Sequence, residues 1–222
     1  MIVLALDTAL AACSAAVVDE HAVRAAHSEP MTRGHQERLA PLVQETMAEA
    51  GLAFFALDRV GCTVGPGSFT GLRVGLAFAK ALGLALDRPC IGVGTLESLA
   101  AGLDGFVAAA IEARGEQLYF QVFESGVALT APNLLSVDAA AARLAELRSG
   151  GPVRIVGPGA ARLAGVIGGA EVDPVPAPDP VALARLVARR APTAAGPSPL
   201  YLRPPDARTI AERAADRAGA PP

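Results

Sequence analysis

The sequence predicts an α/β fold built from two related halves. Short runs rich in Val, Ala and Leu alternate with amphipathic stretches of about ten to fifteen residues, and this alternation is typical of sheets flanked by helices. A strand-rich opening occurs at the N-terminus and again from about Phe106, which indicates an internal repeat. Hydrophobic residues make up 52% of the 222 residues and aromatic residues only 4%, so we expect cores of Ala, Val and Leu.

The first half is expected to open with an antiparallel meander, because three short apolar runs leave no room for helices between them. A helix follows in which Leu39, Val43 and Met47 share one face. An apolar run then leads through a glycine-rich elbow into a long helix of small residues. The elements expected here are strands at 2–8, 11–19, 22–28, 59–64 and 89–93 and helices at 36–50, 70–86 and 95–101.

The second half repeats this pattern with two paired strands and a hairpin at Arg114-Gly115-Glu116, which Glu112, Arg114 and Glu116 are expected to cap. The elements expected here are strands at 107–113, 117–123 and 153–156 and helices at 137–148 and 180–190. We therefore predict an N-terminal lobe at 1–103, a C-terminal lobe at 104–203 and a flexible tail at 204–222, in which 210–217 could form one or two helical turns.

The most informative stretch is Gly65-Pro66-Gly67-Ser68-Phe69-Thr70-Gly71-Leu72-Arg73. Gly65 and Gly67 can adopt positive φ, and Pro66 fixes its own φ near the value that a turn requires. Ser68 and Thr70 are good acceptors for the unpaired N–H groups at a helix start. This composition predicts a rigid elbow between a strand and a helix.

The helix after the elbow carries a ridge of small residues, because Gly71, Gly75, Ala79 and Gly83 recur at every fourth position and share one face. Each helical glycine costs about 1 kcal/mol relative to alanine, so close packing of a neighbouring backbone must offset that cost. The residues alone leave two alternatives open, which are packing within the same chain and a subunit interface.

Composition and charge exclude several classes of protein. The N-terminus begins directly with strand-like residues and the most apolar helix is interrupted by Lys80, so we expect a cytoplasmic chain without a membrane span. Cys13, Cys62 and Cys90 form no CxxC pair and are expected to be small buried hydrophobes. The net charge is −3, but the charge is uneven, because the segment from Arg185 onward contains seven arginines and only three acids. This basic end could form a solvated helix face, or it could contact an RNA backbone weakly.

The chain lacks the usual signatures of catalysis. The turn after Asp7-Thr8 contains no glycine, lysine or arginine to hold a phosphate. The elbow is too short for a Walker loop. The helix N-terminus that follows it could still bind an anion with the help of Arg73. The three histidines do not have metal-ligand spacing. Ser68 is not in a G-x-S-x-G elbow, and no histidine follows it in the chain to act as its base.

Taken together, these segments closely resemble the TsaB (YeaZ) family, the dimerisation subunit of the bacterial system that makes N6-threonylcarbamoyladenosine at position 37 of tRNAs reading ANN codons. The resemblance covers about residues 1–203, and the nine-residue elbow is its most specific part. The other matching segments are Leu4-Ala5-Leu6-Asp7-Thr8-Ala9, Cys13-Ser14, His35, Leu39-Ala40-Pro41-Leu42, Gly92-Val93-Gly94-Thr95-Leu96, Ala110-Ile111-Glu112-Ala113-Arg114, Tyr119 and Tyr201-Leu202-Arg203. The chain departs from the family in having Glu112-Ala113-Arg114 for Asp-Ala-Arg and Gly115-Glu116 one position early.

The resemblance implies an actin-like ATPase (ASKHA) superfamily fold of two ribonuclease-H-like lobes with mixed sheets flanked by helices. It implies a non-catalytic subunit without metal or cofactor, which supports the catalytic subunit TsaD, joins TsaE in a larger complex, contacts tRNA indirectly and forms a homodimer when TsaD is absent. For the ridge it favours the interface alternative. The resemblance implies a partner interface formed by residues of the two helices, namely Leu39, Val43, Met47, Gly71, Arg73, Val74, Gly75, Phe78, Ala79, Leu82 and Gly83. The residues of this chain that match the family motif are Asp7, Thr8, His35, Gly65, Pro66, Gly67, Ser68, Phe69, Thr70, Glu112, Arg114, Tyr201 and Arg203.

A second hypothesis is an independent ATPase or phosphotransferase of the actin-like class that uses Asp7. A third is direct tRNA binding by the arginine-rich end, which predicts a steep salt dependence.

Overall fold

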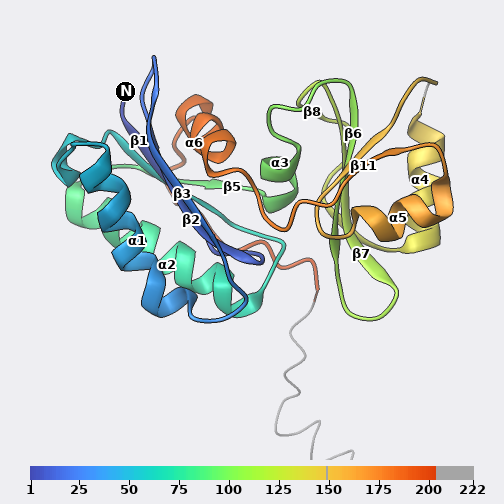
Figure 1. Cartoon of the computed structure of the whole chain (residues 1–222), viewed down its shortest axis with the longest axis horizontal. Helices are drawn as coiled ribbons and strands as arrows, with labels where there is room; N and C mark the ends of the chain where they lie inside the picture. Colours follow the sequence, from blue (N-terminus) through green and yellow to red (C-terminus); the bar gives the residue numbers. More distant parts are fainter. Residues whose placement is uncertain (149, 204–222) are drawn as a thin grey trace, which may run out of the picture.

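The computed structural model describes residues 1–148 and 150–203, and it places them in two lobes that lie side by side (Figure 1). The first lobe is a five-stranded sheet in the order β3-β2-β1-β4-β5. Its strands are β1 (Val3–Asp7), β2 (Ala12–Val18), β3 (Val23–Pro30), β4 (Arg59–Thr63) and β5 (Cys90–Val93). The meander β1-β2-β3 is antiparallel, as expected, whereas β4 and β5 add in parallel beside β1.

Helices cover both faces of this sheet (Figure 1). One face carries α1 (His35–Glu49) and α2 (Phe69–Leu86), which contact each other, and the other carries α6 (Pro180–Arg189). The strands β1 and β2 are therefore buried along their entire length, whereas β3 at the edge of the sheet is largely exposed. A short 3₁₀ turn, η1 (Phe54–Ala56), leads from α1 into β4.

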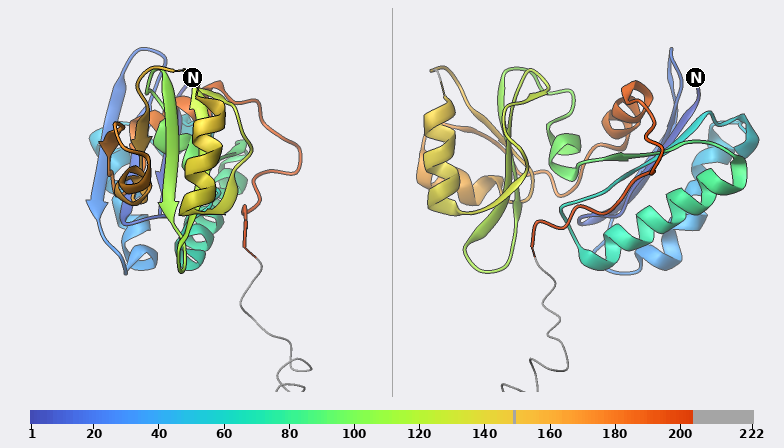
Figure 2. Two further views of the ribbon diagram at one scale, coloured as in Figure 1. Left: turned by 90° about the vertical axis from the view of Figure 1, so that its right-hand side faces the viewer. Right: turned by 180° about the vertical axis from the view of Figure 1, so that it is seen from behind.

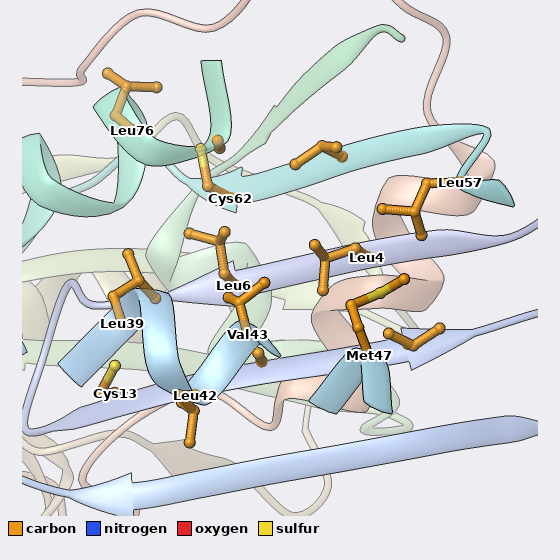
Figure 3. Packing of buried hydrophobic residues seen from close by; sticks show 14 residues of the cluster. Leu4, Leu6, Cys13, Leu39, Leu42, Val43, Met47, Leu57, Cys62 and Leu76 are labelled. Carbon is orange, nitrogen blue, oxygen red and sulfur yellow. The ribbon is translucent and has the colours of Figure 1, made fainter. Parts of the chain in front are cut away.

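The core under α1 and α2 is built mainly from leucine, valine and alanine side chains, as the composition predicts, together with one methionine and two cysteines. Figure 3 shows Leu39, Val43 and Met47 of α1 turned toward Leu4 and Leu6 of β1. Cys13 and Cys62 lie in the same cluster and are buried, which confirms that interpretation for these two, whereas Cys90 is half-buried.

The second lobe is a mixed sheet in the order β11-β10-β6-β7-β8, with β9 paired to β7. Its strands are β6 (Phe106–Glu112), β7 (Gln117–Glu124), β8 (Val127–Ala128), β9 (Asn133–Ser136), β10 (Arg154–Val156) and β11 (Glu171–Asp173). Helices α4 (Val137–Leu147) and α5 (Ala160–Ile167) cover its outer face, while α3 (Thr95–Ala100) packs on the face toward the first lobe (Figure 1).

The last helix of the described residues, α6, returns to the first lobe. Leu183, Ala184 and Val187 of α6 pack against Val3 and Ala5 of β1. The predicted second-lobe range 104–203 therefore includes a helix that packs with the first sheet, because its apolar face matches the open face of β1 and β2. Figure 2 shows residues 191–203 leaving α6 and running across the first lobe toward the start of α2. The predicted tail at 204–222 lies outside the described residues.

Helix α2 is long and apolar enough to cross a membrane by length and composition, with 18 residues and a mean hydropathy of 1.4. A third of that helix is buried, mainly against β4, α1, β1 and β5. Helices in the cores of globular domains have the same length and composition, so this measure alone carries no conclusion.

Candidate functional site

The elbow between β4 and α2 forms as the sequence predicts. Ser68 is the N-cap of α2, where its hydroxyl accepts a hydrogen bond from the Gly71 N–H at 3.3 Å. Gly65 has a φ of 117°, and a Cβ at this position would lie 2.6 Å from the Leu200 carbonyl oxygen. The glycine is therefore required by both the backbone conformation and the close approach of residue 200.

The elbow and the start of α2 lie directly on the turn between β1 and β2. The Ser68 N–H donates to the Ala9 carbonyl at 2.8 Å, and the Thr8 hydroxyl donates to the Gly71 carbonyl at 2.7 Å. A Cβ on Gly67 would lie 2.5 Å from the Ala9 carbonyl oxygen. Small residues are needed here because two segments of the same chain meet backbone to backbone.

The small-residue ridge faces the chain's own sheet, so the expectation that Gly71, Gly75, Ala79 and Gly83 contact a partner is wrong. A Cβ on Gly71 would overlap the Thr8 carbonyl oxygen, and one on Gly75 would lie 2.5 Å from Thr8 Oγ1. Ala79 is fully buried, and Gly83 packs beside Arg88 and Cys90. The four-residue spacing correctly placed these residues on one face of α2. Strands β1, β4 and β5 of the same chain cover that face, rather than a second polypeptide.

Three further residues expected at the interface also lie in the core. Leu39, Val43 and Met47 are at most 2% exposed and pack against the sheet. Their shared face is the buried face of an amphipathic helix, and the opposite face of α1 is the one that a partner can reach. The interpretation of Val43 and Met47 as partner contacts is therefore corrected, whereas Leu39, although 1% exposed, also borders the groove between α1 and α2.

The remaining expected interface residues lie at the accessible side of α2. Arg73 is exposed, and Val74, Phe78 and Leu82 are half-buried. They border or adjoin a groove of about 610 Å³ between α1 and α2. Its lining is Gln36, Leu39, Phe69, Thr70, Arg73, Val74, Ala77, Phe78 and Ala81. Phe69 is 51% exposed and Leu84, further along α2, is 85% exposed, so this face presents apolar side chains to solvent.

An aromatic and cationic cluster stands at the start of α2. The Arg73 guanidinium lies 3.7 Å from the centre of the Phe69 ring, and its Nε donates to the Tyr201 hydroxyl at 3.3 Å. The Phe69 and Tyr201 rings are 5.6 Å apart. Sequence reasoning placed Tyr201 in a motif but gave no signal that it contacts residues 128 positions earlier.

Asp7 is fully buried at the end of β1. Its Oδ1 accepts hydrogen bonds from the Thr63 hydroxyl and from the Ala9 N–H, the latter at 3.1 Å. Its Oδ2 has no partner among the described residues. Burial raises the pKa of Asp7 above its ordinary value of 3.8, since desolvation outweighs the hydrogen bonds and the attraction of His35. His35 begins α1 and is also buried, with Nε2 unpartnered in the described chain.

The turn beside Asp7 is closed by the second lobe as well as by the elbow. Leu10 packs into the second-lobe cluster that contains Leu96, Leu99 and Val107. The Ala11 N–H donates to the Pro176 carbonyl at 3.4 Å. Asp7 itself is 0% exposed, so its carboxylate is not accessible to a phosphate in this conformation. Within the described ranges 1–148 and 150–203, no group of three or more His, Cys, Asp or Glu residues could hold a metal ion.

The Glu112–Glu116 motif lies apart from this groove, at the hairpin that joins β6 and β7. Arg162 of α5 donates to the Gly115 carbonyl at 3.0 Å and lies 3.6 Å from the Glu116 carboxylate. Glu112 and Arg114 are both exposed. A hairpin forms at the predicted position, but the contacts that brace it come from Arg162, which the sequence did not indicate, and the structure does not bring it to the helical groove.

Comparison with known proteins agrees with the resemblance. Residues 27–151 match the family model described as TsaD: tRNA N6-adenosine threonylcarbamoyltransferase. The protein named tRNA threonylcarbamoyladenosine biosynthesis protein TsaB from Escherichia coli K12 is 38% identical over 129 residues, which is 56% of this chain and 55% of that protein. The chain thus spans about half the length of this curated relative.

Two further matches extend over nearly the whole chain. An uncharacterised protein of Mycobacterium tuberculosis H37Rv is 36% identical over 94% of this chain and 95% of its own length. The solved structure of YeaZ from Pseudomonas aeruginosa is 30% identical, with a TM-score of 0.73, and the match covers 90% of this chain and 99% of that one.

The two lobes and these matches confirm the actin-like ATPase fold that the resemblance implies. The elbow, the Asp7-Thr8 turn that it covers and the agreement along the chain's length lead to the same assignment. The chain belongs to the TsaB (YeaZ) family.

Proposed function

We propose that this chain acts in the biosynthesis of N6-threonylcarbamoyladenosine in tRNA, as a non-catalytic subunit that binds a TsaD-family partner. The names of its curated relatives support the pathway. The partner would occupy the groove between α1 and α2. In this proposal TsaE joins the assembly, tRNA is contacted indirectly, and the chain acts in the cytoplasm.

The observation that carries the proposal is the exposed apolar groove of about 610 Å³ between the two helices. Its lining is apolar apart from Gln36, Thr70 and Arg73, and large side chains such as Phe69 remain accessible. A groove between two helices fits a third helix, because the side chains of one helix pack into the spaces between those of its neighbours. Such a face on a small domain marks an interaction site.

The closed turn at Asp7 supports a non-catalytic role. A nucleotide phosphate could reach the Asp7 carboxylate only if the surrounding chain moved, because Asp7 is fully buried. Asp7 itself shares Oδ1 with Thr63 and Ala9. These contacts favour a structural carboxyl over the alternative of an independent ATPase or phosphotransferase.

The same groove explains how a homodimer would form when TsaD is absent. An apolar face that lacks its partner gains free energy by pairing with the equivalent face of a second copy, around a two-fold axis. We therefore propose that homodimer and heterodimer compete for one surface.

Co-purification with the TsaD-family protein of the same genome tests this function. Ala77→Arg places a long charged side chain inside the groove and should abolish co-purification, and it should also reduce homodimerisation in sedimentation. Ala145→Arg on the exposed face of α4 is the matched control and should leave both unchanged. Retention of the partner by a folded Ala77→Arg variant would contradict the proposal.

A further inference from the structure

The cluster of Phe69, Arg73 and Tyr201 holds one guanidinium group in a fixed orientation. The guanidinium carbon Cζ of Arg73 lies over the Phe69 ring, 3.7 Å from its centre. Its Nε is bonded to the Tyr201 hydroxyl at 3.3 Å. These two contacts restrict the rotamers of an otherwise exposed arginine before a partner arrives. The side chain therefore loses less conformational entropy on binding.

Tyr201 is held in place by the segment that precedes it. The Leu200 N–H donates to the Val64 carbonyl at 2.7 Å, directly after β4. Pro197 packs against Gly92 of β5 so closely that a Cβ on this glycine would lie 2.8 Å from the proline Cβ. The segment is therefore attached to the edge of the sheet, and Tyr201 is a rigid neighbour for Arg73.

The terminal nitrogens of Arg73 remain available. Across the described residues, neither Nη1 nor Nη2 has a hydrogen bond or an ion pair within the chain. The other residues that line the groove are uncharged, so Arg73 supplies its single formal charge. A planar pair of N–H donors is the geometry that binds both oxygens of a carboxylate.

We propose that Arg73 is the receptor for a carboxylate, carried by an Asp or Glu side chain of a partner helix that lies in the groove. This inference rests on the proposed function and specifies the partner's chemistry: an apolar helix face with an acidic residue at the end that reaches the start of α2. Tyr201 and Phe69 are positioning residues that orient the guanidinium. A sugar–phosphate chain fits less well, because it would need several cations and the groove offers one.

The test compares affinities for the TsaD-family protein of the same genome by isothermal titration. Arg73→Gln should weaken binding about tenfold to a hundredfold, since the partner's carboxylate loses a charged hydrogen-bond partner. Arg73→Lys should lose nearly as much, because an ammonium group cannot form the paired bonds or the same stacking. Arg143→Gln on α4, which removes an exposed arginine of the second lobe, should have no effect.

Tyr201→Phe tests the positioning role. It removes the hydroxyl that Arg73 contacts and keeps the ring beside Phe69, so we expect a several-fold loss of affinity. This loss should vanish in the Arg73→Gln background, which a merely structural effect of Tyr201 would not do. Melting temperatures within about 2 °C of the unaltered chain would show that the variants are folded.

The outcomes separate the two proposals. If the unaltered chain does not bind the TsaD-family protein at all, the proposed function fails. If it binds and Arg73→Gln binds equally well, this inference alone is overturned. If Arg73→Gln keeps the protein partner but loses affinity for tRNA, Arg73 is a phosphate receptor and the inference is likewise overturned.

Discussion

The hydroxyl of Thr8 donates a hydrogen bond to the carbonyl of Gly71 at 2.7 Å, although 63 residues separate them in the chain. The carbonyl of Thr8 occupies the space that a Cβ at position 71 would need. This contact joins the turn after β1 to the first turn of α2. It explains why a glycine stands at position 71 inside a helix, where helix propensity alone disfavours one.

We predict that Gly71→Ala strongly destabilises the chain, by about 1–3 kcal/mol or more, because the new methyl group overlaps a backbone oxygen that cannot move independently. Urea denaturation followed by circular dichroism would measure the loss. Gly75→Leu should be worse still, since its side chain would meet Thr8 Oγ1.

Gly165→Ala is the matched control for Gly71→Ala. Gly165 lies inside helix α5 with nothing within 4 Å of its virtual Cβ, so alanine should be neutral or should stabilise by up to about 1 kcal/mol. If the two substitutions had equal effects on unfolding, the close contact between Thr8 and Gly71 would have no energetic importance.

The burial of Asp7 makes a prediction about pH. Its pKa is raised in the folded chain relative to 3.8, so the folded state binds this proton more tightly than the unfolded state does. The stabilising contribution of the protonated carboxyl is complete below the unfolded pKa and is lost as the pH rises through the folded pKa. Asp7→Asn removes that loss and keeps Oδ1 as the acceptor for Thr63 and Ala9.

We therefore expect Asp7→Asn to be more stable than the unaltered chain near neutral pH, with the difference shrinking toward pH 3.8. Thermal unfolding at several pH values would measure this. Ser14→Ala, which changes the residue directly opposite Asp7 in the β1–β2 ladder, should leave the slope of stability against pH unchanged. A marked destabilisation of Asp7→Asn at pH 7 would show that the charged carboxylate is needed.

Nucleotide binding provides a direct test of the ATPase alternative. Because Asp7 is fully buried, we expect titration of the isolated chain with Mg-ATP to give no affinity tighter than about 10 μM, which corresponds to about −7 kcal/mol. Tighter binding that Asp7→Asn abolished would revive an independent enzyme.

The sequence predicted the helices and strands more completely than it predicted which parts of the chain pack against them. Periodicity gave α1, α2 and the β1-β2-β3 meander nearly to their ends, because their apolar patterns are long and regular. It missed α5 and β11, whose few residues carry too little pattern to stand out from loops. It also missed β8 and β9, the short strands that follow the β7 turn.

The candidate site shows the same limit. Four-residue spacing correctly placed Gly71, Gly75, Ala79 and Gly83 on one face, but spacing cannot say whether a sheet of the same chain or another protein covers that face. The accessible face was predicted only in part, through Arg73, Val74, Phe78 and Leu82. The contact of Tyr201 with Arg73 depends on how residues 191–203 return to the sheet, which no local pattern records.

That return depends on the junction between α6 and the first sheet, and Arg59 holds this junction. Its Nη1 donates to the carbonyls of Val187, Ala188 and Arg190 at 3.2, 3.0 and 2.6 Å, at the C-terminal end of α6. Those carbonyls have no partner further along the helix, and a cation beside them also suits the negative end of the helix dipole.

We predict that Arg59→Met lowers the free energy of unfolding by about 1.5–3 kcal/mol, because charged hydrogen bonds to several carbonyls are lost together. Arg143→Met, which removes only the exposed pair with Glu146, should cost no more than about 0.5 kcal/mol. Since α6 leads into the segment that carries Tyr201, Arg59→Met should also increase hydrogen exchange at Leu200, whose N–H is bonded to Val64. Unchanged exchange at Leu200 in a destabilised variant would mean that the segment is held at β5 independently of α6.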